Sequence, residues 1–421
     1  MTATIDDASD QTRDDARDAQ RDELAGRLAG AVLATLDLQA VYIGDRLGLY
    51  RALEEGGVAT APELAKRAGI HPRYAREWLE HQAVGAILDV DDVTAAPDER
   101  RYALPASHAA VLTDPESPWL LAPLSRFVVG TAATMPRLLD AYRTGGGVDW
   151  ADYGADVVEA QEGINRPQFH HLMGEWIGAL PDIADKLRRG RGRVADVACG
   201  TGWSSISIAH HFPDVDVDGI DIDEGSIARA KAHAASAGLG GRVSFLFADA
   251  ASADGEGRYD LVTIFEALHD MARPAEVLAA ARRLLAPGGA VLVGDERVAE
   301  TFTAPGDEAE RLFYGYSVVA CLANGLVDQP SVGTGTVMRP STVERYAREA
   351  GFTGFTVLPT QHEAFRLRVE AVEAERPLTA GTPVLSSRAR SGGEGRPAQP
   401  VLASPSTPRG LSRAPARRRG G

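Results

Sequence analysis

The chain has 421 residues, enough for two or three domains, and 44% of them are apolar, which is ordinary for a globular protein. Its formal net charge of −15 argues against a nucleic acid or an anionic membrane bound through bulk electrostatics. Two cysteines, Cys199 and Cys321, provide neither a disulfide framework nor a metal-ligand cluster, so we expect a reducing, cytoplasmic environment and no metal.

The N-terminus is acidic. Residues 1–23 carry eight acidic residues against three arginines and lack the apolar centre of a signal peptide. We expect residues 1–22 to be disordered because they can bury little surface. The most apolar stretch elsewhere, residues 119–135, is broken by a proline and an arginine and is too short to span a bilayer. No membrane partner is predicted.

From residue 24 the pattern becomes helical. Apolar side chains recur every four residues over residues 24–40, so one stripe of this helix faces a partner. Packing within the same chain is the alternative. A further helix is predicted over residues 43–53.

Residues 60–81 have a helix-turn-helix outline. Thr60, the early proline and Glu63 form a helix start, Gly69 makes a turn, and a second helix begins at His71. Residues 84–90 and 101–104 can pair as a small wing. Arginines and glutamates balance on the second helix, which therefore has no net charge to bind phosphates, and DNA binding is not expected.

Residues 114–164 are predicted to be a mostly helical linker with a flexible break at the glycines of residues 145–147. Another helix follows and contains Asn165, Phe169 and Met173. Phe169 and Met173 are four residues apart, a spacing that core packing also produces. The adjacent His170 and His171 do not make a metal site, because neighbouring helical residues point in different directions.

The most informative segment joins an apolar strand over residues 194–198 to an amphipathic helix through a glycine-rich turn. Gly200 and Gly202 can adopt positive φ and let a ligand approach the backbone, while the N–H groups of the helix face it. This pattern predicts a nucleotide-binding cradle. A tight turn without a ligand is the alternative.

Acidic residues end three successive predicted strands. Asp221 lies nineteen residues beyond Gly202, a spacing that suits a carboxylate binding both ribose hydroxyls. Asp196 is placed to hold the ammonium group of a methionine moiety, and Asp249 to accept a hydrogen bond from an adenine amino group. Turns alone need no acid at each strand end. Together these residues favour S-adenosylmethionine (SAM) over NAD.

Five motifs in the expected order make residues 165–367 resemble a class I SAM-dependent methyltransferase. The five motifs lie at residues 196–202, 221, 249–250, 259–270 and 284–293. Ser204 stands where many members have a third glycine, and we expect only a small change in the shape of the cradle. The resemblance also implies that Ala198, Ile222, Ala250 and Phe265 contact the cofactor.

The resemblance implies an α/β fold, with a Rossmann-like seven-stranded sheet behind an N-terminal, mostly α-helical winged-helix domain. It extends to small-molecule O-methyltransferases, in which the N-terminal domain and its long first helix form a dimer interface. In those relatives a segment like the one holding Asn165, Phe169 and Met173 flanks the substrate and SAM. A SAM-sensing transcriptional regulator and a non-catalytic SAM-binding protein are the alternative functions.

His269 follows the fourth predicted strand at the edge of the sheet where ligands of such folds bind. Its unperturbed pKa near neutrality suits a general base, and in the O-methyltransferases that the segment resembles, this histidine deprotonates a hydroxyl. The alternative is a residue that only lines the site. Asp270 orients the ring or caps the next helix. Solvated charge is the expected role for Asp295, Glu296 and Arg297.

The sequence thus predicts five regions: a disordered lead (1–22), a winged-helix domain (23–113), a linker (114–164), a SAM-binding domain (165–368) and a tail (369–421). Within the SAM-binding domain, residues 300–340 form an insertion that covers the substrate side, and residues 352–358 and 363–367 form a terminal strand pair. Residues 371–421 hold nine arginines and three glutamates among Pro, Gly and Ser, which predicts disorder. The tail is either a basic arm or the product of a shifted reading frame.

Overall fold

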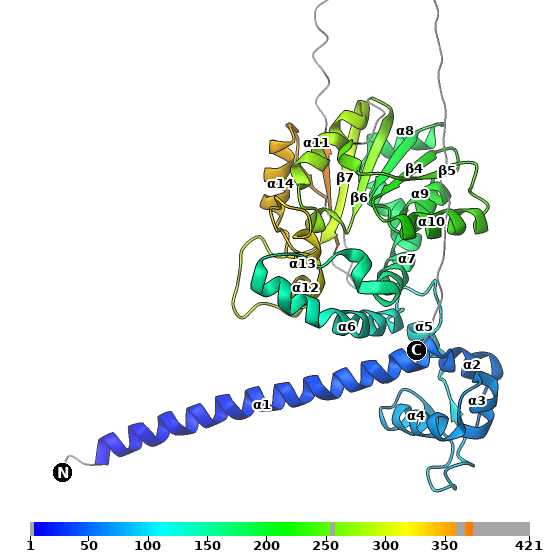
Figure 1. Cartoon of the computed structure of the whole chain (residues 1–421), viewed down its shortest axis with the longest axis vertical. Coiled ribbons are helices and arrows are strands. Elements are labelled where there is room, and N and C mark those ends of the chain that lie inside the picture. Colours follow the sequence, from blue (N-terminus) through cyan, green and yellow to red (C-terminus); the bar gives the residue numbers. More distant parts are fainter. Residues whose placement is uncertain (1–3, 253–256, 359–366, 374–421) are drawn as a thin grey trace, which may run out of the picture. The chain divides into compact units, whose positions relative to one another are not determined.

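The computed structural model describes the backbone of residues 4–252, 257–358 and 367–373 and the side chains of residues 13–252 and 257–358 (Figure 1). Helices make up the N-terminal part of these residues, and a seven-stranded sheet with helices on both faces follows. The predicted tail beyond residue 373 lies outside the described residues.

The N-terminal part contains the predicted helix-turn-helix and wing. Helix α3 opens with the expected capping box: the Thr60 hydroxyl accepts from the N–H of Glu63, and the Glu63 carboxylate accepts from the N–H of Thr60. The elements here are α2 (Leu49–Gly56), α3 (Ala61–Ala68), α4 (Pro72–Val84), β1 (Asp89–Val90), β2 (Tyr102–Ala103) and α5 (Ala106–Leu112). Strands β1 and β2 pair antiparallel, as expected for a wing.

The first helix is longer than the sequence pattern indicated. Helix α1 (Thr4–Arg46) is continuous, which corrects the predicted disorder of residues 1–22 for all but the first three residues. Acids and arginines at helical spacing form exposed ion pairs, such as Arg21 with Asp18 at 2.7 Å, and each such pair gives modest support. At its other end, Arg46 pairs with Asp156 and Glu159 and ties α1 to the rest of the chain.

The middle of α1 exposes its apolar stripe. Leu24, Leu28, Val32 and Leu36 are 47–61% exposed, so packing within the chain does not cover them. Residues 13–46 also form a helix that is long and apolar enough to cross a membrane, by length and composition alone. The charges that flank the stripe lower the average apolar character of the sequence here, so the sequence pattern alone does not indicate such a segment.

The linker is mostly helical, and its last helix continues into the next domain. It contains α6 (Ala122–Thr144), η1 (Trp150–Tyr153) and α7 (Gly154–Gly178), so the predicted boundary at residue 165 falls inside α7. Gly145 ends α6 in the left-handed conformation. Gly147 is tightly packed rather than flexible, because a Cβ there would lie 2.6 Å from the Ala323 carbonyl oxygen.

The sheet has the strand order β5-β4-β3-β6-β7-β9-β8, and its first five strands in this order are parallel. The strands are β3 (Arg193–Val197), β4 (Asp216–Asp221), β5 (Val243–Phe247), β6 (Tyr259–Phe265), β7 (Leu285–Glu296), β8 (Thr356–Val357) and β9 (Leu367–Glu373). Helices α8 (Pro181–Arg188), α9 (Trp203–His211) and α10 (Glu224–Ser236) pack on one face, and α11 (Pro274–Leu284) and α14 (Pro340–Glu349) on the other. The predicted seven-stranded Rossmann-like sheet is confirmed.

The last strand extends past the predicted end of the domain. Strand β9 pairs antiparallel with β7 and β8 and runs to Glu373, whereas the sequence placed the boundary at residue 368. The predicted strand over residues 363–367 lies outside the described residues except for its last position. The arginine-rich composition begins within this strand, and for that reason the sequence pattern predicts an end that is too early.

Gly147→Ala should lower the free energy of unfolding by about 1–3 kcal/mol, because its Cβ would collide with backbone atoms of Val327 and Ala323 that cannot move independently. Gly146→Ala is the matched control, since its Cβ would meet only the Thr144 hydroxyl at 3.4 Å. Urea unfolding of both variants measures the difference. Equal stability of the two variants would show that this contact does not constrain the chain.

Candidate functional site

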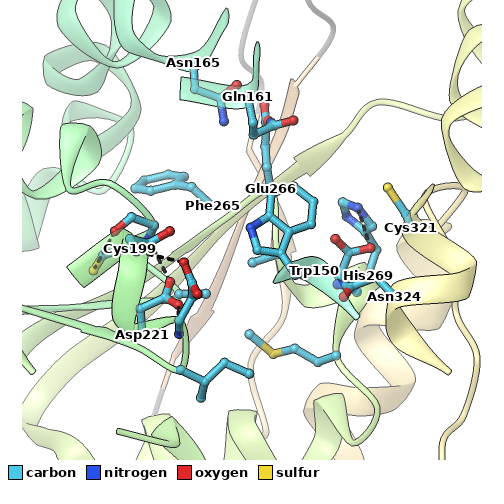
Figure 2. A pocket seen from close by; sticks show the side chains of 18 of the residues that line it. Trp150, Gln161, Asn165, Cys199, Asp221, Phe265, Glu266, His269, Cys321 and Asn324 are labelled. Carbon is cyan, nitrogen blue, oxygen red and sulfur yellow. Dashed lines mark hydrogen bonds and ion pairs between the residues drawn. The ribbon is translucent and has the colours of Figure 1, made fainter. Parts of the chain in front are cut away.

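A cavity of about 660 Å³ lies at the carboxyl edge of the parallel strands (Figure 2). Its walls combine strand ends, helix α7 and a helical segment from the predicted insertion, made of α12 (Glu308–Tyr316), the π-helical turn η4 (Ser317–Cys321) and α13 (Leu322–Gly325). The insertion therefore covers the cavity, as the sequence predicted. Segments far apart in the chain meet here because every parallel strand ends at the same edge.

The glycine-rich turn between β3 and α9 forms one end of this cavity. Gly200 has φ of 51° and Gly202 has φ of 86°, both in the left-handed region. A Cβ at Gly202 would lie 2.7 Å from the Phe245 ring, so this glycine is needed for space as well as for conformation. Gly200 and the start of α9 line the cavity, and the free N–H groups of the helix N-terminus suit a polar ligand.

Asp221, at the end of β4, reaches the cradle directly. Its Oδ2 accepts a hydrogen bond from the Gly200 N–H at 2.8 Å, and its Oδ1 accepts one from the Asp223 N–H at 2.8 Å. Burial raises the pKa of this carboxyl, while the backbone donors oppose the rise. The carboxylate also lines the cavity, where its remaining lone pairs can accept from two ribose hydroxyls.

Most of the other residues expected at the cofactor border the cavity, but Gly202, which packs against Phe245 and Ala230, does not. Asp249 accepts from the Ala251 N–H at 2.9 Å with Oδ1, so its second oxygen can accept from a ligand. Its contact with an adenine amino group stays a prediction. The expected residues that line the cavity are Ala198, Gly200, Asp221, Ile222, Asp249, Ala250 and Phe265.

Asp196 does not reach the cavity, which corrects the expected contact with a methionine ammonium. Its side chain is 1% exposed, and it accepts hydrogen bonds from the hydroxyls of Ser204, Ser205 and Thr263 at 2.5–2.8 Å. Burial raises the pKa of Asp196, and these hydroxyls oppose the rise. Ser204, in the place of a third glycine, thus anchors α9 to β3.

The three residues expected near the acceptor divide between the cavity and the core. Asn165 and Phe169 line the cavity, and the Phe169 ring also packs against Trp176 and Phe265. Met173 is fully buried in the core between the sheet and its helices and does not line the cavity. The core alternative is therefore correct for Met173, and substrate contact is excluded for it in this conformation.

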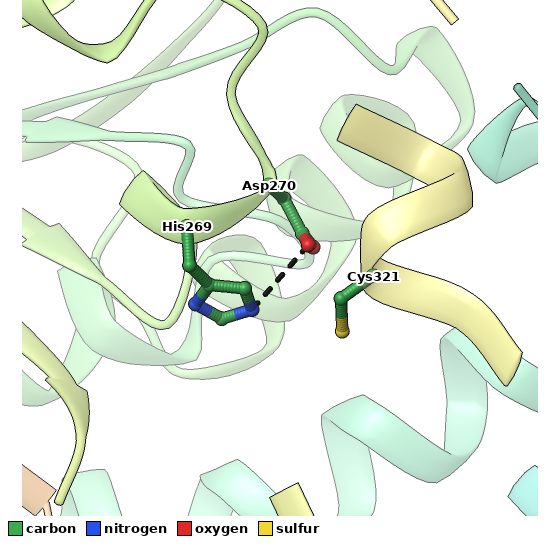
Figure 3. A group of neighbouring side chains, drawn as sticks. All are labelled: His269, Asp270 and Cys321. Atoms are coloured by element: carbon green, nitrogen blue, oxygen red, sulfur yellow. Dashed lines mark ion pairs between the residues drawn. The ribbon is translucent and has the colours of Figure 1, made fainter. Parts of the chain in front are cut away.

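His269 lies in the short helix η3 (Leu268–Asp270) and borders the cavity. Its Nδ1 lies 2.7 Å from Oδ1 of Asp295, at the end of β7, and its Nε2 lies 3.3 Å from Oδ1 of Asp270 (Figure 3). Asp295 is 5% exposed, which corrects its expected role as solvated charge. Asp270 contacts the ring and does not cap α11, whose first turn follows Arg273.

The carboxylates decide the protonation of His269. Burial alone would lower the pKa of the imidazole, but the charges of Asp295 and Asp270 and the hydrogen bond to Asp295 hold it well above its usual range. The two carboxylates therefore favour the imidazolium form of His269. An imidazole accepts a proton only in its neutral form, so a raised pKa moves this role to higher pH.

Cys321 approaches the same histidine, although it is 52 residues away in the sequence. The π-helical turn η4 carries it there, and His269, Asp270 and Cys321 offer donor atoms within 4.8 Å of one another. This donor set could bind a metal, which the sequence reading did not anticipate. Burial, however, raises the pKa of the Cys321 thiol to about 11, and each imidazole nitrogen already lies close to a carboxylate.

Glu266, Glu296, Gln161 and Tyr316 also border the cavity. Glu266 accepts from the Gln161 Nε2 at 2.8 Å and has a φ of 49°, unusual for a residue other than glycine. The sequence named Glu266 only as a neighbour of His269 and gave no role to Gln161 or Tyr316. The signal that could have found Glu266 is an acid directly after a buried parallel strand.

Two family models match the chain at the two domains described above. A model described as a methyltransferase domain matches residues 194–289, and one described as an Rv2258c-like winged HTH domain matches residues 34–114. The first range includes the cradle, Asp221 and His269. The second includes the helix-turn-helix and its wing.

Among similar proteins, 27-O-demethylrifamycin SV methyltransferase of Amycolatopsis mediterranei is 33% identical over 176 residues, or 41% of this chain and 59% of that protein. The chain thus spans less than two thirds of that relative. A ubiquinone biosynthesis O-methyltransferase of Ralstonia nicotianae is 31% identical over 185 residues, or 44% of this chain and 70% of that protein.

The fold has solved counterparts. Human N-acetylserotonin methyltransferase, in complex with SAM, superposes with a TM-score of 0.62 over 83% of this chain and 97% of that one, at 17% identity. This likeness shows the fold of both domains together. The cofactor in that complex agrees with the cradle found here.

Asp221→Ala should weaken SAM binding by about 100-fold or more, because two charge-assisted hydrogen bonds of roughly 1.5–3 kcal/mol each are lost. Isothermal titration calorimetry measures the affinity, and circular dichroism checks that the variant is folded. Unchanged affinity would show that the ribose does not lie beside β4.

Proposed function

Because the chain belongs to the SAM-dependent methyltransferases, we propose that it transfers the methyl group of SAM to an oxygen atom of a small-molecule acceptor. One observation carries this proposal: His269, held by Asp295 at 2.7 Å, borders the same cavity as the cofactor cradle. In Figure 2 the cradle residues Cys199 and Asp221 lie on one side of the cavity and His269 on the other.

SAM, when bound, supplies a methyl group on a sulfonium whose sulfur leaves as a neutral thioether. The residues of the chain need only position the acceptor, exclude water and remove one proton. His269 removes that proton through Nε2, the nitrogen that does not face Asp295. Asp295 acts as a positioning residue, because its carboxylate fixes the ring and stabilises the imidazolium that forms.

The walls of the cavity indicate what kind of acceptor it takes. Near the insertion and α6 the lining is apolar and aromatic, and a cavity of about 660 Å³ with such a wall suits a small ring system rather than a macromolecule. The residues of this wall are Leu124, Phe127, Trp150, Leu312, Phe313, Tyr316 and Val327. Polar contact for a hydroxyl comes from the His269 end of the cavity.

The alternative of a DNA-binding regulator finds no support in the helix-turn-helix. On α4 and its wing, Arg73 pairs with Glu77, Arg76 with Asp98, and Arg100 with Glu80. These three arginines are thus each neutralised by a nearby acid, and little counterion release would be gained from them. A non-catalytic SAM-binding protein would not need a histidine held by a buried aspartate beside its ligand.

The exposed stripe of α1 supports a homodimer. A helix that exposes leucines and valines on one face needs a partner, and a second copy offers the same stripe. The acidic N-terminal turns and the net charge of −15 disfavour an anionic membrane surface as that partner. We also propose that the protein is cytoplasmic.

His269→Ala and His269→Gln should both retain SAM binding, while turnover of a phenolic acceptor falls about 100-fold or more, as is usual for loss of a general base. Glutamine keeps a polar contact and much of the volume but cannot take up a proton at neutral pH. Transfer of a radiolabelled methyl group measures turnover, and wild-type activity in EDTA tests for a required metal. Restoration of activity by glutamine would reduce His269 to a residue that shapes the site.

The rate should rise with pH through the raised pKa of His269, because the base works only when unprotonated. Asp295→Asn removes the nearest negative charge, so the acid limb of the kcat/KM profile should move to lower pH while the maximal rate falls. A profile from pH 6 to 10 measures both effects. An unshifted limb would show that another group controls the rate.

Leu28→Asp combined with Val32→Asp should convert the dimer into a folded monomer, because a stripe that is buried between copies cannot hold unpaired carboxylates. Val93→Asp, on an exposed loop of the wing, is the control and should leave the dimer intact. Light scattering measures the mass. A dimer in the double variant would place the interface elsewhere.

A further inference from the structure

Glu266 occupies a position between the cofactor cradle and His269. It directly follows β6, and the β3–β6 register aligns Val197 with Ile264, so Glu266 lies level with the first residues of the glycine-rich turn. Its N–H donates to the Gly294 carbonyl at 2.7 Å, which fixes the backbone in its left-handed conformation. Figure 2 shows Glu266 in the middle of the cavity, with Asp221 on one side and His269 on the other.

Glu266, like its neighbour Glu296, lines the cavity with no ion-pair partner among the described side chains. Asp196 is saturated by three hydroxyls, and Glu162 is paired with Trp203 and Arg229. Among the described side chains, Glu266 has a neutral donor, Gln161, but no lysine or arginine within ion-pair distance. Its carboxylate therefore faces the cavity without a lysine or arginine partner among the described side chains.

The surroundings of Glu266 disfavour its charge when the cavity is empty. Burial raises the pKa of this carboxyl to about 7, Asp295 adds to the rise, and Asn165, His269 and Gln161 oppose it. Glu296 lies nearby, and burial together with Glu266 raises its pKa well above the usual range. A positively charged ligand would reverse this balance and stabilise the carboxylate.

We propose that Glu266 recognises the sulfonium charge of SAM, so that the site binds the cationic donor more tightly than its neutral demethylated product. This inference rests on the proposed function. During transfer the acceptor oxygen forms a bond to the methyl carbon, the carbon–sulfur bond breaks with its electron pair left on sulfur, and the acceptor proton goes to His269. The charge that Glu266 binds thereby disappears, which favours release of the product.

Three ligands distinguish recognition of the sulfonium charge by Glu266 from contacts that do not depend on this charge. SAM has a sulfonium, sinefungin has an amine-bearing carbon in the same place, and S-adenosylhomocysteine has a neutral sulfur, while all three share the ribose, adenine and amino-acid groups. Glu266→Gln should weaken SAM and sinefungin about 10-fold and leave S-adenosylhomocysteine within about twofold, since tenfold corresponds to 1.4 kcal/mol. Calorimetry gives the three affinities.

Asp221→Asn is the matched control, because a ribose contact is common to all three ligands and their affinities should fall together. Equal weakening of all three by Glu266→Gln, or unchanged SAM affinity, would overturn the inference. Binding of none of the ligands to the wild-type protein would instead overturn the proposed function. Retained affinity for S-adenosylhomocysteine shows that the Glu266 variant is folded.

A second measurement uses the wild-type protein alone. The ratio of SAM to S-adenosylhomocysteine affinity should rise as pH increases through about 7, because Glu266 then loses the proton that opposes a cation. Other titratable groups face it from β7 (Asp295 and Glu296), η3 (His269) and α12 (Tyr316). The rise should vanish in Glu266→Gln. A rise that persists in the variant would assign the effect to one of these other groups and overturn the inference.

Discussion

The arrangement of the site depends on the parallel pairing of β3, β4, β6 and β7, because parallel strands deliver their carboxyl ends to one edge. Each strand brings one functional group to that edge: the glycine turn, Asp221, Glu266 and Asp295. None of these groups is close to another in the sequence. The hydrogen-bond register of the sheet alone sets their relative heights, and a slip by one residue would turn side chains away from the cavity.

Within this frame, unbalanced buried charge determines the chemistry. His269 lies between the carboxylates of Asp295 and Asp270, while Glu266 and Glu296 have no lysine or arginine ion-pair partner among the described side chains. Such a pair of acids resists ionisation until a cation enters. Under the proposed function, the acids that raise the pKa of His269 also favour a cationic cofactor, so that cofactor binding and proton transfer depend on one electrostatic environment.

Much of this could be predicted because local rules govern it. The glycine turn and the capping box at Thr60 are encoded by a few adjacent residues, and acids after buried strands mark the ligand edge. Asp196 and Met173 were misplaced because the direction of a side chain depends on packing. Cys321 was missed because a π-helical turn in the insertion brings it to His269, and no periodicity signals that approach.

The acceptor is selected by the part of the chain that the sheet does not determine. The apolar wall comes from α6, η1 and α12, and Gly147 lets the loop after α6 press against the backbone of Val327. These segments are joined by side-chain packing and by the hydrogen bonds of Tyr153 to η4 rather than by strand register. Substitutions there can reshape the wall while the cradle and His269 stay in place. The apolar wall can thus change independently of the cradle, because different kinds of contact hold the two halves of the cavity.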